Sequence, residues 1–248
     1  ANGDWSSDVC SSDLFNTTSY RFLNQGGIIM TLSLFVKDPG SALTHFIGMI
    51  MAAIAALPLL AIAARHDSYH AVAAFAIFAG SMILLYAAST IYHTFNISEK
   101  MNKILRKADH MMIFILIAGS YTPICVIPLK DTVGYPLLAL VWTVAIIGML
   151  IKAFWITCPK WFSSIIYISM GWLCVLAMVP LVQALPAAAF VWLVAGGVIY
   201  TVGGIIYALK LPLFNSRHQF FGSHEIFHLF VMAGSLCHYV VMFYIALM

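Results

Sequence analysis

The sequence predicts an all-α integral membrane protein built as a bundle of seven transmembrane helices, and two observations carry that prediction. Of the 248 residues, 62% are hydrophobic and only 8% are charged, whereas a soluble domain has about 25% charged residues. The apolar residues also form long unbroken runs, unlike the alternating polar and apolar pattern of a membrane β-barrel. No soluble fold could cover this much apolar surface, so soluble classes are excluded.

The beginning of the chain differs from the rest. Residues 4–14 (DWSSDVCSSDL) are polar and aperiodic, and they are typical of a translated sequencing adapter. We therefore interpret residues 1–29 as a non-native or disordered tail and expect the native protein to begin near Met30, without a signal peptide. Residues 30–248 are expected to form a single seven-helix membrane domain.

Seven apolar segments are each long enough to cross a bilayer as a helix, which takes about 20 residues. Pro58, Pro123 and Pro180 fall inside spans, where neighbouring helices can accommodate a kink. The connections are short and no internal repeat is visible, so the sequence favours one compact bundle over a transporter built from inverted halves. The expected spans are 42–64, 70–92, 110–128, 135–155, 163–183, 187–209 and 222–247.

Taken in order, several spans carry polar residues at one end. The first has His45 near its start, the second ends in Ser89 and His93, and the third opens at Asp109. The seventh opens with the tightest motif of the chain, His224-Glu-Ile-Phe-His228. Because its histidines are four residues apart, both lie on one face of a helix, at the spacing that a single metal ion needs.

Small residues recur nearer the middle of the membrane. Ala-Gly-Ser occurs at residues 79–81, 118–120 and 233–235, and the sixth span contains Gly196-Gly197 and Gly203-Gly204. Such residues normally allow close helix packing. The alternative is that they leave room for an acyl chain below the polar cluster, and the sequence leaves both interpretations open.

Lysine and arginine orient the bundle. With seven spans, the N-terminal segment and the connections after the second, fourth and sixth spans lie on one side of the membrane, and that side holds most of the cationic residues. By the positive-inside rule the N-terminus is cytoplasmic and the C-terminus faces out. The inner set is Arg21, Lys37, Lys100, Lys103, Arg106, Lys107, Lys152, Lys160, Lys210 and Arg217, against Arg65 and Lys130 outside.

The basic balance does not require a nucleic-acid partner. The net charge is only +3, and the cationic loops serve topology and contact anionic lipid headgroups. We therefore expect membrane lipids as partners and an integral location in a bacterial inner (plasma) membrane. The sequence does not determine the oligomeric state.

The predicted orientation places the polar residues of three spans at one depth, in the inner leaflet. Three imidazoles, from His93, His224 and His228, would form a zinc site of the open, catalytic kind, with its fourth position accessible to water. Asp109 could hydrogen-bond that water or orient a histidine, and Ser89 could steady a polarised carbonyl. All-imidazole ligation with a carboxylate nearby makes zinc the predicted cofactor.

Each of these residues also has an interpretation that involves neither metal binding nor catalysis. Histidines near a membrane interface often serve as hydrogen-bonding anchors, and Ser89 could bond a carbonyl of its own helix. Glu225 lies about 100° round the helix from His224, so we interpret it as a loop or headgroup contact. His238 lies about 15 Å beyond His228, too far to share an ion. His110 points away from Asp109, and His45 borders the site at most.

These motifs resemble the hemolysin III branch of the progestin and adipoQ receptor family, which includes the adiponectin receptors. The matching pieces run in family order from about residue 38 to the end. They are Ser89-Thr-Ile-Tyr-His93-Thr-Phe, Lys107-Ala-Asp109-His-Met-Met-Ile-Phe, Gly119-Ser-Tyr-Thr-Pro123 and His224-Glu-Ile-Phe-His228.

The resemblance implies seven helices with an inward N-terminus, and zinc held at His93, His224 and His228 with Asp109 and Ser89 nearby. The family usually has Glu-x-x-Asn-x-x-Thr-His before its first span. Here Thr44-His45 is kept, while Asp38 and Ser41 stand in the other places.

Three functions fit these features, and we rank them. The first is a zinc-dependent hydrolase of an amide or ester bond in a membrane lipid, such as a ceramide-like or fatty-acyl substrate. The related alkaline ceramidases use a similar Ser, Asp and three-His set on a lipid amide. The second is a pore-forming cytolytic protein with structural zinc, although polarity here clusters at one end rather than along a conducting path. The third is a lipid-sensing, receptor-like protein without turnover.

Overall fold

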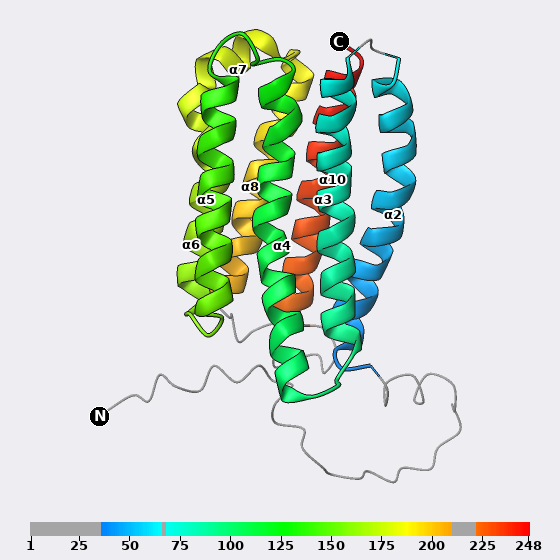
Figure 1. Ribbon diagram of the computed structural model, residues 1–248, viewed down its shortest axis with the longest axis vertical. Helices are drawn as coiled ribbons and strands as arrows, with labels where there is room; N and C mark the ends of the chain where they lie inside the picture. Colours follow the sequence, from blue (N-terminus) through cyan, green and yellow to red (C-terminus); the bar gives the residue numbers. More distant parts are fainter. Residues whose placement is uncertain (1–35, 66–67, 210–221) are drawn as a thin grey trace.

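The computed structural model describes residues 36–65, 68–209 and 222–248, which form an elongated bundle of helices (Figure 1). Seven helical segments in these ranges are long and apolar enough to cross a membrane, so the predicted class and number of spans are confirmed. The predictions for residues 1–29, including a start near Met30, lie outside the described residues.

The helices begin at recognisable local signals. Pro39 stands in the first turn of α2 (Pro39–Ala63), where its missing N–H costs nothing. The hydroxyl of Ser68 accepts the N–H of Ala71 at the start of α3 (Tyr69–Thr94). The remaining elements are α4 (Glu99–Val126), α5 (Gly134–Phe154), α6 (Lys160–Gly171), the 3₁₀ segment η2 (Trp172–Ala177), α7 (Met178–Ala184), α8 (Ala187–Leu209) and α10 (Ser223–Ala246).

Helix α4 begins well before the apolar segment predicted at 110–128. Ser98 caps it by accepting the N–H of Met101, and Glu99 in the first turn suits the positive end of the helix dipole. The charged residues that follow therefore extend the helix beyond its apolar part. As a consequence, Asp109 lies inside the helix rather than at its start.

The fifth span is interrupted, and the interruption begins before Pro180. Between α6 and α7 the chain passes through η2, and Pro180, shortly after it, has no N–H to bond the carbonyl of Leu176. The hydroxyl of Tyr121 on α4 supports the break: it donates to the carbonyl of Gly171 at 2.6 Å and accepts the N–H of Cys174 at 2.9 Å. The kink expected at Pro180 thus takes the form of a 3₁₀ segment beginning at Trp172.

Helix α10 is last in the sequence but packs between α2 and α8 and also reaches α4. Helix α4 is the least apolar of the seven segments and the most buried, so its polar residues face other helices rather than lipid. The starts of α2, α4 and α10 and the end of α3 lie at the same end of the bundle (Figure 1). This arrangement gathers the polar ends of four helices.

Some of the small residues allow close helix packing and others line a cavity, whereas the predicted use of that space by an acyl chain stays a prediction. A side chain on Gly119 would come within 2.8 Å of Ser81 Cβ on α3, and one on Gly234 within 2.8 Å of a ring on α8, so these glycines permit close packing. The glycine pairs of α8 divide between the two roles. Gly196 and Gly203 press against α10, whereas Gly197 and Gly204 line a cavity.

Candidate metal centre

Three histidines meet where α3 ends and α10 begins. His93, His224 and His228 each offer one ring nitrogen, and these three atoms lie within 4.8 Å of one another. His93 and His228 are each only 2% exposed. The structure therefore brings together all three histidines predicted as ligands, in a group that could hold a metal ion.

One pair of the nitrogens has the spacing found in a tetrahedral metal site. With metal–nitrogen bonds of about 2.0–2.1 Å, two ligand nitrogens in a tetrahedral site lie about 3.3 Å apart. Nε2 of His224 lies 3.2 Å from Nε2 of His93. These two imidazole nitrogens therefore have the separation of neighbouring ligands in a zinc site.

Helix α2 supplies hydrogen-bond partners to the outer nitrogens of two of these rings. Asp38 Oδ2 lies 2.9 Å from His93 Nδ1, and Thr44 Oγ1 lies 3.2 Å from His228 Nδ1. The backbone N–H of Asp38 also donates to the carbonyl of His93 at 2.8 Å. Carboxylate and hydroxyl partners of this kind fix the orientation of a ligating imidazole, which leaves its other nitrogen for the metal.

Glu225 has a structural role that the sequence did not indicate. We interpreted it as a loop or headgroup contact. Instead, one carboxylate oxygen accepts the backbone N–H of Gly222 at 2.8 Å, and the other accepts the hydroxyl of Ser41 at 2.6 Å. Glu225 thus caps the start of α10 and joins it to α2, which fixes the part of α10 that carries the two histidines.

Asp109 lies on α4, outside the group of three histidines, in the wall of a cavity between the helices. It is 8% exposed, and its Oδ2 is 3.5 Å from Nδ1 of His110, which itself bonds the carbonyl of Arg106 at 2.9 Å. The carboxylate that contacts a candidate ligand is Asp38, not Asp109. Of the two roles considered for Asp109, orienting one of these three histidines is not the one seen in the structure.

Two buried polar side chains have no hydrogen-bond partner among the described residues. Ser89 Oγ and both ring nitrogens of His45 make no hydrogen bond to any described residue. Ser89 is 1% exposed and His45 3% exposed. The self-bonded alternative for Ser89 is therefore not what the structure shows, and His45, expected at most to border the site, stacks directly on His228 with ring centroids 3.6 Å apart.

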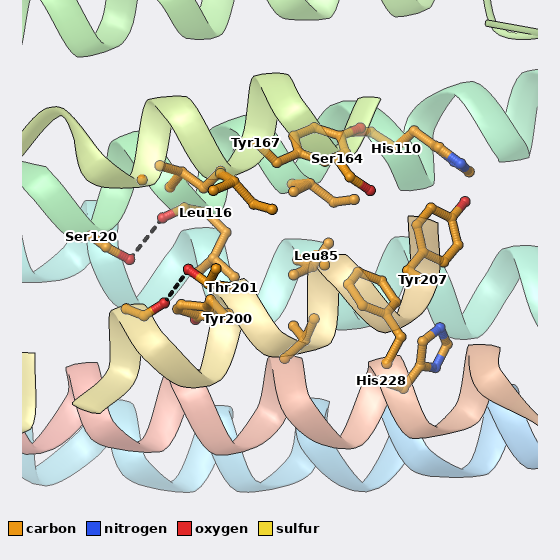
Figure 2. A pocket seen from close by; sticks show the side chains of 18 of the residues that line it. Leu85, His110, Leu116, Ser120, Ser164, Tyr167, Tyr200, Thr201, Tyr207 and His228 are labelled. Atoms are coloured by element: carbon orange, nitrogen blue, oxygen red, sulfur yellow. Dashed lines mark hydrogen bonds between the residues drawn. The ribbon is translucent and has the colours of Figure 1, made fainter. Parts of the chain in front are cut away.

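A cavity extends from the histidines toward the other end of the bundle, between α4, α6, α8 and α10. It contains about 1150 Å³ of empty space, a figure that includes space open at its sides. His110, Tyr207 and His228 lie near one end in Figure 2, and Ser120 and Thr201 toward the other.

The cavity wall is mainly apolar, although polar side chains such as Ser120, Thr201 and His238 also line it beyond the three histidines. From His224 to His238, both in the wall, α10 rises roughly 20 Å at 1.5 Å per residue. His238 itself bonds the carbonyl of Gly234 through Nδ1 and is not part of the metal group. The apolar lining includes Leu85, Ile113, Leu116, Ile117, Ile168, Trp172 and Val231.

Comparison with known proteins agrees with these motifs. A family model described as "Haemolysin-III related" matches residues 34–239. Hemolysin-3 from Bacillus cereus is 38% identical over 216 residues, which cover 86% of this chain and 94% of that protein. The Hemolysin-3 homolog of Bacillus subtilis (strain 168) is 38% identical over 209 residues, covering 84% and 94%.

A shorter region of the chain is similar to an adiponectin receptor. The adiponectin receptor protein of Drosophila melanogaster is 38% identical over 55 residues, which cover 21% of this chain and 12% of that protein. The resemblance to the hemolysin III proteins, first seen in the serine, aspartate and histidine motifs, is thus confirmed by similarity over most of the chain, and the short adiponectin receptor match fits the same relationship.

Proposed function

This chain belongs to the haemolysin-III-related family, and we propose that it is a zinc-binding membrane hydrolase that cleaves an amide or ester bond of a lipid. One observation carries the proposal: a group of three histidines lies at the polar end of a long, mainly apolar cavity within a membrane bundle. That juxtaposition suits a ligand with a polar head and an apolar chain.

Zinc is the proposed metal because the ligand set is entirely imidazole. His93 is backed by Asp38 and His228 by Thr44, the type of support that ligating histidines usually have. When bound, zinc polarises a carbonyl group and makes water easier to deprotonate. Three protein ligands would leave one position open, as in catalytic rather than structural zinc sites.

Asp109 and Ser89 are the proposed catalytic residues of the chain itself. Water adds to the carbonyl carbon of the lipid while Asp109 takes up its proton, and the hydroxyl of Ser89 donates a hydrogen bond to the carbonyl oxygen. The C–N or C–O bond then breaks, and the proton passes from Asp109 to the leaving amine or alcohol. Both residues line the cavity, and neither is committed to a metal-ligating histidine.

The orientation follows from charge. We propose that the end of the bundle with the metal centre faces the cytoplasm, so that the site lies in the inner leaflet of a bacterial plasma membrane. Among the described residues, Lys37, Lys100 and Lys103 lie at that end, whereas Lys130 lies in the turn between α4 and α5 at the opposite end.

The two alternative functions receive less support. A conducting pore needs polar groups along its whole depth, but the wall of the cavity is mainly apolar. A signalling receptor would need room for a signalling module, and the described connections at the end with the histidines, residues 95–98 and 155–159, are too short to hold one. The name Hemolysin-3 is that of the relatives, and no feature of this cavity favours lysis over hydrolysis.

The proposal is tested with purified protein and a panel of N-acyl and O-acyl lipids. Release of fatty acid is expected from wild-type protein and should stop on removal of the metal by a chelator. Ser89→Ala should lower the rate by about tenfold or more while leaving zinc in place. Ser81→Ala is the matched control, since Ser81 is equally buried on α3 but bonds the carbonyl of Phe78. Turnover that survives in His228→Ala would refute the hydrolase.

A further inference from the structure

His45 is a buried histidine for which the chain provides no hydrogen-bond partner. Both of its ring nitrogens are unpaired among the described residues, although the side chain is only 3% exposed. Buried polar groups in folded proteins are nearly always hydrogen-bonded, so an unpaired imidazole at this depth needs an explanation. His45 lines the same cavity as the candidate metal centre.

Metal ligation does not account for this histidine. The group of ligand atoms within 4.8 Å comprises His93, His224 and His228, without His45. His45 instead stacks on His228 with an interplanar angle of 5° and packs near the ring of Tyr86 at 5.1 Å. These contacts fix the plane of the imidazole and satisfy neither nitrogen.

Ser89, on the neighbouring helix α3, is also buried without a hydrogen-bond partner among the described residues. Most hydroxyls inside these helices bond a carbonyl one turn earlier: Thr90 bonds Tyr86, Ser120 bonds Leu116 and Thr122 bonds Ala118. Ser89, which also lines the cavity, makes no such bond. A neutral imidazole and a hydroxyl can each donate and accept one hydrogen bond or more, so the two side chains together offer an unused set of both kinds.

We infer that His45 is a ligand-contacting residue that, together with Ser89, hydrogen-bonds the polar group of a bound lipid whose chain occupies the cavity. The inference rests on the proposed function and adds to it a residue of α2 that binds the ligand rather than the metal. It requires no change in the charge of His45, because the neutral ring has both a donor and an acceptor.

The test compares two probes that differ only in the polar group: pyrene-labelled dodecanol and pyrene-labelled dodecane. Wild-type protein in detergent should bind the alcohol more tightly than the alkane. His45→Phe keeps a flat ring to stack on His228 but removes both nitrogens. It should reduce the preference for the alcohol roughly tenfold, the loss expected for one to two hydrogen bonds, with zinc content and alkane affinity unchanged.

Two further variants sharpen the comparison. His45→Asn restores a donor and an acceptor and should keep most of the preference. His238→Phe is the matched control, because His238 lines the same cavity but has its Nδ1 bonded to the carbonyl of Gly234; its preference should equal that of wild type. If His45→Phe fails to fold, Ser89→Ala tests the same subsite and should lose a similar factor.

The possible results separate the two proposals. An unchanged preference in His45→Phe, with normal zinc, would overturn the role of His45 while leaving the hydrolase intact. Loss of zinc in that variant would also overturn it, because His45 would then act through the metal. Failure of wild-type protein to bind either probe would remove the lipid-binding cavity itself, and the inference with it.

Discussion

His93 shows how the candidate centre is organised at the scale of single residues. Its Nδ1 faces Asp38 at 2.9 Å and its Nε2 faces His224 at 3.2 Å, so each nitrogen has a separate task. The backbone of Asp38 is also bonded to the carbonyl of His93, which places the carboxylate without relying on side-chain freedom alone. A ring fixed from behind loses little further freedom when it binds a metal.

Asp38→Asn should therefore weaken metal binding without abolishing it. An amide is a poorer acceptor than a carboxylate and can also turn its NH₂ group toward the ring, so we expect zinc affinity to fall about tenfold to a hundredfold. Competition with a chromogenic chelator measures this directly. Asp131→Asn, in the exposed turn between α4 and α5, is the control and should bind as wild type does. Equal affinities in all three proteins would contradict the role of Asp38.

The histidines could be predicted from sequence, but their supports could not. His224 and His228 share a helix face by spacing alone, and the joint motif with His93 and Asp109 indicated a metal site. Asp38 and His93 are 55 residues apart and Ser41 and Glu225 are 184 apart. No local periodicity shows which of these side chains oppose one another. The replacement of the family's glutamate by Asp38 was the single signal that pointed to this residue.

At the scale of helices, the apolar segments predicted the spans and nearly all of their ends, and the start of α4 is the exception. Hydropathy marks where lipid contact stops, whereas a helix stops where its backbone is capped. Helix α4 accordingly runs from Glu99, with the cap at Ser98, and places Asp109 within a continuous helix. The 3₁₀ segment between α6 and α7 depends on the contact of Tyr121 with Gly171 and Cys174, which only the packed bundle reveals.

Close packing of α3 on α4 yields a prediction at this scale. Gly119→Val should destabilise the bundle by about 1–3 kcal/mol, since its side chain would overlap Ser81 and force the helices apart. Gly80→Val is the matched control, because a side chain there meets nothing within 4 Å. Unfolding in mixed detergent micelles gives the free energies. Equal losses in the two variants would show that helix propensity, rather than packing, sets the effect.

At the scale of the whole molecule, the charge bias predicts which end faces the cytoplasm. A cysteine placed at Lys130 should react with a membrane-impermeant thiol reagent in intact spheroplasts, whereas one placed at Lys100 should react only after lysis. Both positions are exposed at opposite ends of the bundle, and the unsubstituted chain gives the background from native cysteines. The reverse pattern of labelling would place the metal centre in the outer leaflet.

The whole account depends on the three histidines holding a metal, and metal analysis of purified protein tests this most directly. Wild-type protein should contain about one zinc per chain, and both His93→Ala and His228→Ala should lose it. His238→Ala, which removes a buried histidine from the same cavity but outside the metal group, should retain it. Metal-free wild type, or zinc kept by both ligand variants, would contradict the account.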